Sequence, residues 1–235
     1  MRFYAWKENF AKADPMIVEN HPLPMFMCRV LASRGIKDSA AARDFLNASQ
    51  TLSDPMLMHD MEKAVSIVRC AIDEGKKILV FGDYDCDGIT ATVMLYEYLE
   101  GEGADVCYYI PERLGEGYGL SMQTVEMIIS SGIELIITVD NGISAVAEIA
   151  RAKEAGIEVV VTDHHALPQQ LPPADALLNS AFEADDSPSR YLCGAAMAFK
   201  LIAALEQQVQ GDDVQDLLLE QYGDLTAIAT LADVV

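Results

Sequence analysis

The sequence predicts an α/β fold, a doubly wound and mainly parallel sheet flanked by helices. Two observations support this prediction. Between Lys77 and Asn179, short apolar runs alternate with segments of helical periodicity, and such alternation is typical of parallel strands joined by crossover helices. Before residue 55 and after Ala181 the pattern is helical only. We therefore expect a small helical lead-in over residues 1–55 and an α/β domain over 56–235 that ends in a helical part.

The lead-in is expected to contain two short helices, at Met25–Ser33 and Ser39–Leu46, in a segment interrupted by prolines. The first helix of the α/β domain is predicted at Met61–Glu74, because apolar residues recur along one side of it. Asp60 is expected to cap the N-terminus of this helix, and Gly75 is expected to end it.

The strands and the remaining helices follow from the spacing of apolar residues. The predicted strands are Ile78–Phe81, Asp105–Ile110, Leu135–Val139, Ile157–Thr162 and Ala176–Asn179. The helices between them are Ile89–Leu99, a helix capped by Ser121 that runs to Ser130, and Ser144–Ala155. The C-terminal helices are Gly194–Gln208, Val214–Gln221 and Leu225–Ala232.

The net charge restricts the substrates that the chain can attract at long range. With 16 basic and 37 acidic residues, the 235-residue chain carries a formal charge of -21. This charge opposes the approach of a polyanion. Part of the excess is local, since no Lys or Arg follows Lys200. A nucleic-acid substrate would therefore need bound metal ions and a few well-placed arginines.

Cysteine usage and hydropathy predict the compartment. The five cysteines are scattered and form no CxxC pair, which indicates reduced thiols rather than disulfides or a zinc site. No apolar run reaches the roughly 18–20 residues that span a bilayer, and the N-terminus lacks the apolar core of a signal peptide. We expect a cytoplasmic protein without a membrane segment.

The strand Ile78–Phe81 leads into three aspartates at alternate positions, Asp83, Asp85 and Asp87. On an extended chain these side chains would converge on one side. Three carboxylates at such close range repel one another unless a cation lies between them. Hard divalent ions such as Mg²⁺ and Mn²⁺ prefer oxygen ligands. This segment therefore predicts one wall of a metal site.

Two other interpretations of this segment fail. An EF-hand calcium loop requires Glu six residues after its glycine, and the residue six positions after Gly88 is Met94. The element before the aspartates is also a predicted strand instead of a helix. The chain contains neither a GxxxxGK[ST] phosphate loop nor a GxGxxG dinucleotide motif.

Two further strands end in polar residues. Asp140-Asn141-Gly142 follows the third strand, where it is either an ordinary turn or a strand-end carboxylate site, and Asp163-His164-His165 follows the fourth. Ligands of doubly wound sheets gather at the carboxyl ends of the strands. All three motifs are therefore expected at one edge of the sheet. Adjacent side chains diverge, so we expect one histidine to bind metal and the other to contact substrate.

These motifs, in this order, resemble those of the DHH phosphoesterase superfamily and, within it, the RecJ family of single-stranded-DNA-specific exonucleases. The segments that carry the resemblance are GDYDCDGIT at 82–90, EGYGLS at 116–121, TVDNGIS at 138–144, VTDHH at 161–165 and ATLADVV at 229–235. The resemblance runs from about Leu31 to Val235. It implies that the family's DHHA1-type and OB-fold domains lie outside this chain.

The resemblance implies a site with two divalent ions, Mn²⁺ or Mg²⁺. It places Asp85 on one ion and Asp87 on the other, with Asp140 bridging them. His164 and Asp233 would complete the second ion's site, whereas Asp83 is either a ligand or a partner of one. The residues expected to act in catalysis are Asp140, Asp163 and His165. Of these, His165 would contact the scissile phosphate and Asp163 would orient a histidine.

The expected substrate contacts lie around this centre. Arg113 is the best-placed cation for a phosphate. Tyr118 either stacks on a base or packs in a plain turn, and Gly119 lets the backbone approach the substrate. Ser189, Arg190 and the amides near Gly194 form a second candidate phosphate site, and Asn141 completes the predicted set.

The resemblance thus implies a metal-dependent 5′→3′ exonuclease that hydrolyses phosphodiester bonds of single-stranded DNA in repair and recombination. It also implies a single-strand-binding protein and a helicase as partners. Two alternatives stay open: a DHH-type phosphoesterase acting on short oligonucleotides or cyclic dinucleotides, and a catalytically silent binding relative. A silent relative should have lost metal ligands, and every expected carboxylate and histidine is present here.

Overall fold

The computed structural model describes residues 23–36, 38–47, 52–112, 119–184, 187–210 and 214–235. The chain divides into two compact units, residues 1–52 and 53–235. The first unit contains helices α2 (Met25–Ser33) and α3 (Ser39–Asn47), which bury Cys28, Leu31 and Ala42. The side chain of Asp38 accepts hydrogen bonds from the amides of Ala40 and Ala41 in the first turn of α3.

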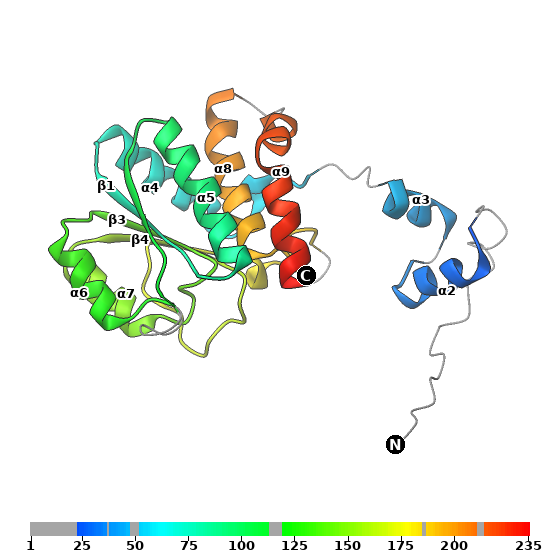
Figure 1. Cartoon of the computed structure of the whole chain (residues 1–235), viewed down its shortest axis with the longest axis horizontal. Helices are drawn as coiled ribbons and strands as arrows, with labels where there is room; N and C mark the ends of the chain where they lie inside the picture. Colours follow the sequence, from blue (N-terminus) through cyan, green and yellow to red (C-terminus); the bar gives the residue numbers. More distant parts are fainter. Residues whose placement is uncertain (1–22, 37, 48–51, 113–118, 185–186, 211–213) are drawn as a thin grey trace, which may run out of the picture. The chain divides into compact units, whose positions relative to one another are not determined.

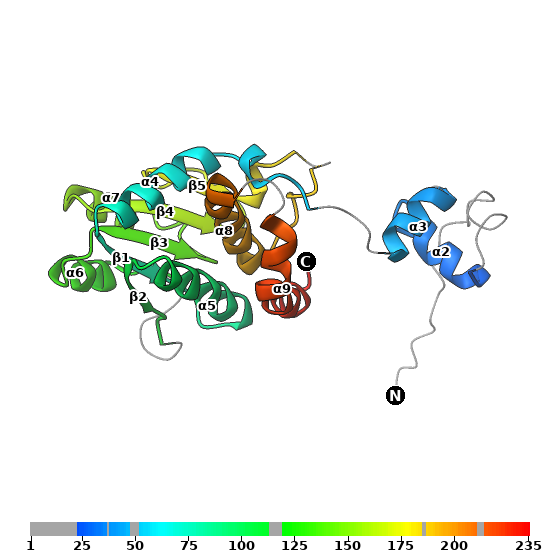
Figure 2. The same cartoon turned by 90° about the horizontal axis from the view of Figure 1, so that it is seen from above.

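The second unit is built on the predicted parallel sheet, which confirms the fold class. Its strands are β1 (Lys77–Phe81), β2 (Asp105–Tyr109), β3 (Leu135–Val139), β4 (Glu158–Asp163) and β5 (Ala176–Asn179). They lie in the order β2-β1-β3-β4-β5, and every neighbouring pair is parallel, as Figure 2 shows from above. The chain first winds outward from β1 to β2 and then returns to β3, so its winding direction reverses between β1 and β3.

Helices cover both faces of the sheet (Figure 1). One face packs against α6 (Met122–Ser130) and α7 (Val146–Glu154), and the other packs against α4, α5 and α8, on which α9 lies. These four helices are α4 (Met61–Asp73), α5 (Cys86–Gly101), α8 (Gly194–Gln210) and α9 (Val214–Asp233). The central strands β1, β3 and β4 are almost entirely buried, as expected for strands covered by helices on both sides.

Two short 3-10 helices complete the second unit, η1 (Pro55–Leu57) before α4 and η2 (Ser180–Phe182) after β5. Within the described residues, no helix combines the length and apolarity that a membrane crossing requires.

Several element boundaries differ from the prediction for local reasons. Helix α5 begins at Cys86 instead of Ile89, because Asp85 caps it by accepting a hydrogen bond from the amide of Gly88 at 3.0 Å. Helix α7 begins at Val146 instead of Ser144, since Ser144 lies in a turn. The two helices predicted at Val214–Gln221 and Leu225–Ala232 form one continuous helix, α9.

Asp60 precedes α4 but does not cap it. Its φ of 54° is left-handed and its side chain makes no capping hydrogen bond. Asp60 instead accepts hydrogen bonds from Lys63 at 2.6 Å and from the amide of Leu177 at 3.3 Å. The other end of α4 follows the prediction, because Gly75 has a φ of 65°, a conformation that favours glycine after a helix.

Candidate metal centre

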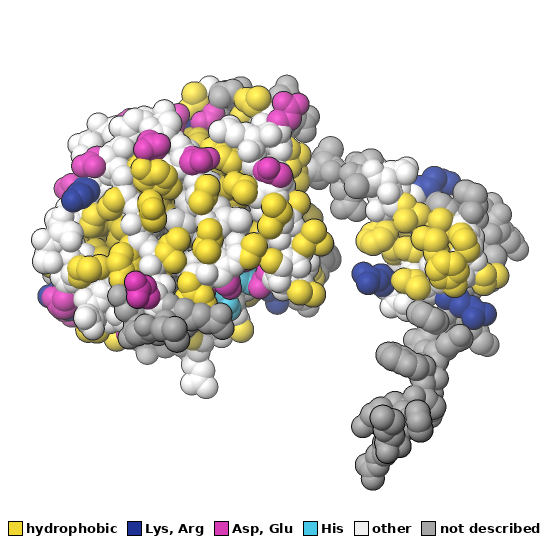
Figure 3. Space-filling model, in the orientation of Figure 1, with side chains coloured by type: hydrophobic (Ala, Val, Ile, Leu, Met, Phe, Trp, Pro, Cys, Tyr) yellow, Lys and Arg dark blue, Asp and Glu magenta, His cyan; other side chains and the backbone are white. Residues whose placement is uncertain are grey.

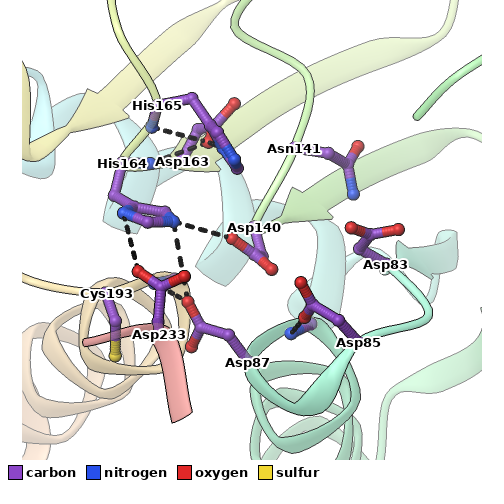
Figure 4. A network of polar contacts seen from close by, with 12 residues as sticks. Asp83, Asp85, Asp87, Asp140, Asn141, Asp163, His164, His165, Cys193 and Asp233 are labelled. Carbon is purple, nitrogen blue, oxygen red and sulfur yellow. Dashed lines mark hydrogen bonds and ion pairs between the residues drawn. The ribbon is translucent and has the colours of Figure 1, made fainter. Parts of the chain in front are cut away.

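The candidate centre lies at the carboxyl ends of β1, β3 and β4, beside the point where the winding direction reverses. This is the usual ligand position in doubly wound sheets. The structure brings together the three motifs that the sequence placed at strand ends, and the end of α9 adds Asp233 (Figure 4). Asp83, Asp87, Asp140 and Asp163 are each no more than 2% exposed.

The three aspartates after β1 occupy two kinds of backbone, which corrects the expectation of an extended segment. Asp83 follows the strand, Asp85 caps α5, and Asp87 lies in the first turn of that helix. The alternation of an extended chain therefore does not bring them together. The helical turn instead carries Asp87 to a different part of the centre, so Asp83 and Asp85 face Asp140, whereas Asp87 faces His164 and Asp233 (Figure 4).

Asp140 lies in the middle of the centre. Its φ of 62° is left-handed, a conformation that Asp and Asn adopt more readily than other residues with a side chain. Burial and, to a lesser extent, nearby Asp87 and Asp85 raise its pKa to about 7, although the contact with His164 opposes this shift. The site therefore holds more negative charge than the protein alone neutralises.

His164 contacts carboxylates from three different elements. Its Nε2 lies 3.1 Å from Asp140 Oδ1 and 3.6 Å from Asp87 Oδ2, and its Nδ1 lies 3.8 Å from Asp233 Oδ2. Burial lowers the pKa of His164, but the hydrogen bond with Asp140 and the surrounding carboxylates outweigh burial and raise it. The imidazole of His164 therefore lies among carboxylate oxygens and holds its proton more tightly than a free histidine does.

Asp163 and His165 form a separate pair. Asp163 Oδ1 lies 2.7 Å from His165 Nδ1 and accepts hydrogen bonds from the amides of His164 and His165, while Oδ2 accepts one from the amide of Ile143. Burial alone would raise the pKa of Asp163, but these hydrogen bonds lower it. The hydrogen bond with Asp163 raises the pKa of His165 to about 9, despite partial burial of the ring. Asp163 therefore orients a cationic His165.

Three groups of potential metal ligands overlap in this centre. They are Asp83, Asp85 and Asp140; Asp87, His164 and Asp233; and Asp140, His164 and His165. Within each group the ligand atoms all lie within 4.8 Å of one another. Carboxylate oxygens make up most of these ligand atoms, and such oxygens suit Mn²⁺ and Mg²⁺. The donor set and the raised pKa of Asp140 both fit bound divalent cations.

Only some of the residues predicted to contact substrate lie in the described part of the chain. Arg113 and Tyr118 lie outside the described residues, and Gly119 has a left-handed φ of 73°. Asn141 is buried, and its amide group donates to the carbonyls of Val139 at 2.9 Å and Phe81 at 3.3 Å. Its NH₂ group thus ties the ends of β1 and β3 together, and a substrate contact by Asn141 stays a prediction.

The residues of the second candidate phosphate site make contacts within the protein. Ser189 is buried, 3.1 Å from the hydroxyl of Ser53. Arg190 donates to the carbonyl of Ser180 at 3.3 Å, and its guanidinium lies 5.7 Å from the centre of the Tyr191 ring. The amides of Gly194 and Ala195 both donate to Asp87. These amides are therefore occupied by a carboxylate of the protein.

Sequence reasoning missed the residues that hold the ligands in place. Asn179, at the end of β5, donates to the carbonyl of His165 at 3.0 Å and accepts from the amide of Ala181 at 2.7 Å. Its position at the end of a fifth parallel strand was a usable signal, because that strand pairs with β4 through Asp163 and Asn179. The contact between Asp87 and α8 spans more than a hundred residues and left no local signal.

Comparison with known proteins agrees with this geometry. The family model of the DHH family, N-terminal domain, matches residues 77–230. The chain belongs to the DHH family. Across its whole length it is 36% identical to the single-stranded-DNA-specific exonuclease RecJ of Bacillus subtilis strain 168, of which it covers 29%.

Solved structures of DHH-family proteins match the fold as well. A crystal structure of exonuclease RecJ bound to manganese aligns with 78% of this chain and 45% of its own, at a TM-score of 0.70 and 36% identity. RecJ of Thermus thermophilus in complex with Mn²⁺ aligns with 87% of this chain and 28% of its own, at a TM-score of 0.70 and 31% identity. The chain thus spans less than half the length of each relative.

Proposed function

We propose that this chain is the metal-binding catalytic part of a single-stranded-DNA-specific 5′→3′ exonuclease. The observation that carries the proposal is the set of three overlapping ligand groups, in which Asp140 and His164 each belong to two groups. The similarity to RecJ proteins, two of which were solved with manganese, supports the choice of substrate and ion. Roles in DNA repair and recombination, a cytoplasmic location, and single-strand-binding protein and helicase partners belong to the same proposal.

Two divalent ions, Mn²⁺ or Mg²⁺, fit the ligand groups. Asp83, Asp85 and Asp140 would hold one ion, and Asp87, His164 and Asp233 would hold the other together with Asp140. When bound, such ions lower the pKa of water and neutralise charge on phosphate oxygens. His164 must give up its proton to bind metal, so metal affinity should rise with pH through the pKa of this histidine.

His165 has the geometry to contact the scissile phosphate. Its Nδ1 is bonded to Asp163, its side chain is 45% exposed, and its pKa of about 9 makes it cationic at neutral pH. A cation there would bind the phosphate and stabilise the charge that develops on its oxygens. Asp163 would keep the ring oriented and charged while substrate binds.

The test uses the full-length protein that contains this chain and a 5′-labelled single strand with Mn²⁺. We expect mononucleotides released from the 5′ end, no degradation of duplex DNA, and loss of activity in Asp140→Ala. Faster cleavage of a dinucleotide than of the long strand would favour the oligonucleotide or cyclic-dinucleotide phosphoesterase. Elemental analysis showing no bound metal would favour the silent relative instead.

A further inference from the structure

The first turn of α8 contacts Asp87 with two backbone amides. The N–H of Gly194 donates to Asp87 Oδ2 at 2.6 Å, and the N–H of Ala195 donates to Oδ1 at 2.7 Å. Both oxygens of the carboxylate are therefore held in one orientation, and each keeps a lone pair for a cation. The partial positive charge of the helix N-terminus also attracts a negatively charged group at this position.

The same turn approaches Asp140 so closely that only glycine fits at position 194. A Cβ atom on Gly194 would lie 2.5 Å from Asp140 Cβ and 2.6 Å from Asp140 Oδ1. Asp140 is itself buried and held in a left-handed conformation, so it has little room to move away. The spacing between α8 and the end of β3 thus depends on the absence of a side chain.

The residue before this turn contacts the helix that carries Asp233. Cys193 is fully buried, and its Sγ lies 3.6 Å from the hydroxyl of Thr230 in α9. Thr230 lies about one helical turn before Asp233, and its hydroxyl donates to the carbonyl of Thr226 at 2.8 Å. Cys193 therefore helps to set where the last turn of α9 lies.

We propose that Cys193, Gly194 and Ala195 form a positioning turn that aligns three candidate metal ligands, Asp87, Asp140 and Asp233, without binding metal or substrate itself. The inference rests on the proposed function and deepens it, because it names what sets the metal affinity of the centre. The three ligands come from α5, the end of β3 and α9. The turn donates to Asp87, lies against Asp140 and reaches the helix that carries Asp233 through Thr230.

The first test measures Mn²⁺ binding by calorimetry on the 235-residue chain and its Gly194→Ala variant. We expect Mn²⁺ affinity to fall by about 10–100-fold, the usual effect of disturbing residues that orient metal ligands. The matched control is Gly223→Ala in α9, where an added Cβ would meet only Leu219, at an ordinary 3.5 Å. Melting of both variants in EDTA separates the loss of metal from a loss of folding.

The second test does not depend on Gly194→Ala folding. Thr230→Val removes the hydroxyl that contacts Cys193, and Thr226→Val is the control, because the Thr226 hydroxyl faces Met94 Sδ at 3.5 Å instead. We expect Thr230→Val alone to weaken Mn²⁺ binding several-fold at an unchanged melting temperature in EDTA. Wild-type Mn²⁺ affinity in folded Gly194→Ala, or equal affinities of the two threonine variants, would overturn the positioning role. Failure of the wild-type chain to bind Mn²⁺ would instead overturn the proposed function.

Discussion

The carboxyl group of Asp140 lies in an electrostatically unfavourable environment. It is buried, it lies between other carboxylates, and burial raises its pKa to about 7. A carboxyl group whose pKa is higher in the folded chain than in the unfolded chain binds its proton more tightly when folded. In the absence of metal, the charged form of Asp140 therefore destabilises the folded state at neutral pH.

We predict that Asp140→Asn raises the melting temperature of the chain in EDTA at neutral pH. The unfolded pKa is near 4, so the folded chain loses stability as pH rises from about 4 to about 7, and the whole penalty, on the order of 4 kcal/mol, is present above that range. Asparagine also tolerates the left-handed backbone of residue 140. The stabilisation should shrink towards pH 4, as thermal melting over this pH range would show.

The control for this prediction is Asp85→Asn. Asp85 is exposed, and asparagine can replace it as the cap of α5, so little change in metal-free stability is expected. Both variants should lose most of the stabilisation that Mn²⁺ gives to the wild-type chain. Equal melting temperatures of Asp140→Asn and the wild type in EDTA at neutral pH would show that the charged form of Asp140 does not destabilise the folded state.

At the scale of elements, α8 connects the metal centre to the start of the second unit. Its first turn holds Asp87, and two turns later the buried Lys200 donates to the carbonyl and hydroxyl of Ser53. No described carboxylate forms an ion pair with Lys200. Burial lowers its pKa to about 8, against a weak opposing effect of Asp54. The ammonium group is therefore held by neutral oxygens.

We predict that Lys200→Met removes a rise in stability between about pH 8 and 10.5. In this range the unfolded lysine keeps a proton that the folded one has lost, so the free energy of unfolding of the wild type increases with pH. The increase is on the order of 3 kcal/mol. Chemical denaturation at several pH values measures it, with the exposed Lys63→Met as control. Parallel pH profiles for wild type and Lys200→Met would refute the prediction.

The elements also show which parts of the fold were predictable. The strands were found within one or two residues, because buried parallel strands are continuous apolar runs. The start of α5 was missed, since the polar segment Asp85–Asp87 reads as a loop until the cap and first turn are recognised. Two helices were predicted in place of α9, with Gly223 between them. Packing against α5 and α8 keeps α9 continuous. Tertiary packing outweighed the local helix-breaking signal.

At the scale of the whole molecule, the sequence predicted that the strand ends would converge. It did not predict which of the candidate metal ligands would lie together. The parallel sheet and its edge follow from the alternation of strands and helices. The separation of Asp87 from Asp83 and Asp85, and the occupation of the Gly194 amide by Asp87, depend on contacts between residues far apart in the chain. No periodicity encodes such contacts, so the sequence could not indicate that Asp87 occupies this amide.

The charge of the whole molecule leads to a prediction about DNA. The formal charge is -21, and acidic side chains are spread over the face of the second unit in Figure 3 while basic ones are sparse. Without metal, this charge repels phosphates. Two divalent ions would add four positive charges where five candidate ligand carboxylates converge with His164, namely Asp83, Asp85, Asp87, Asp140 and Asp233.

We therefore predict that Mn²⁺ strengthens binding of single-stranded DNA by the 235-residue chain by about tenfold, roughly 1.4 kcal/mol. Fluorescence anisotropy with a phosphorothioate oligonucleotide, which resists hydrolysis, measures the affinity in Mn²⁺ and in EDTA at matched ionic strength. Asp140→Asn should show no such enhancement, because it removes the carboxylate that we propose the two ions share while leaving the rest of the surface unchanged. Equal enhancement in wild type and Asp140→Asn would mean that Mn²⁺ acts through general screening of the acidic surface instead of through the metal centre.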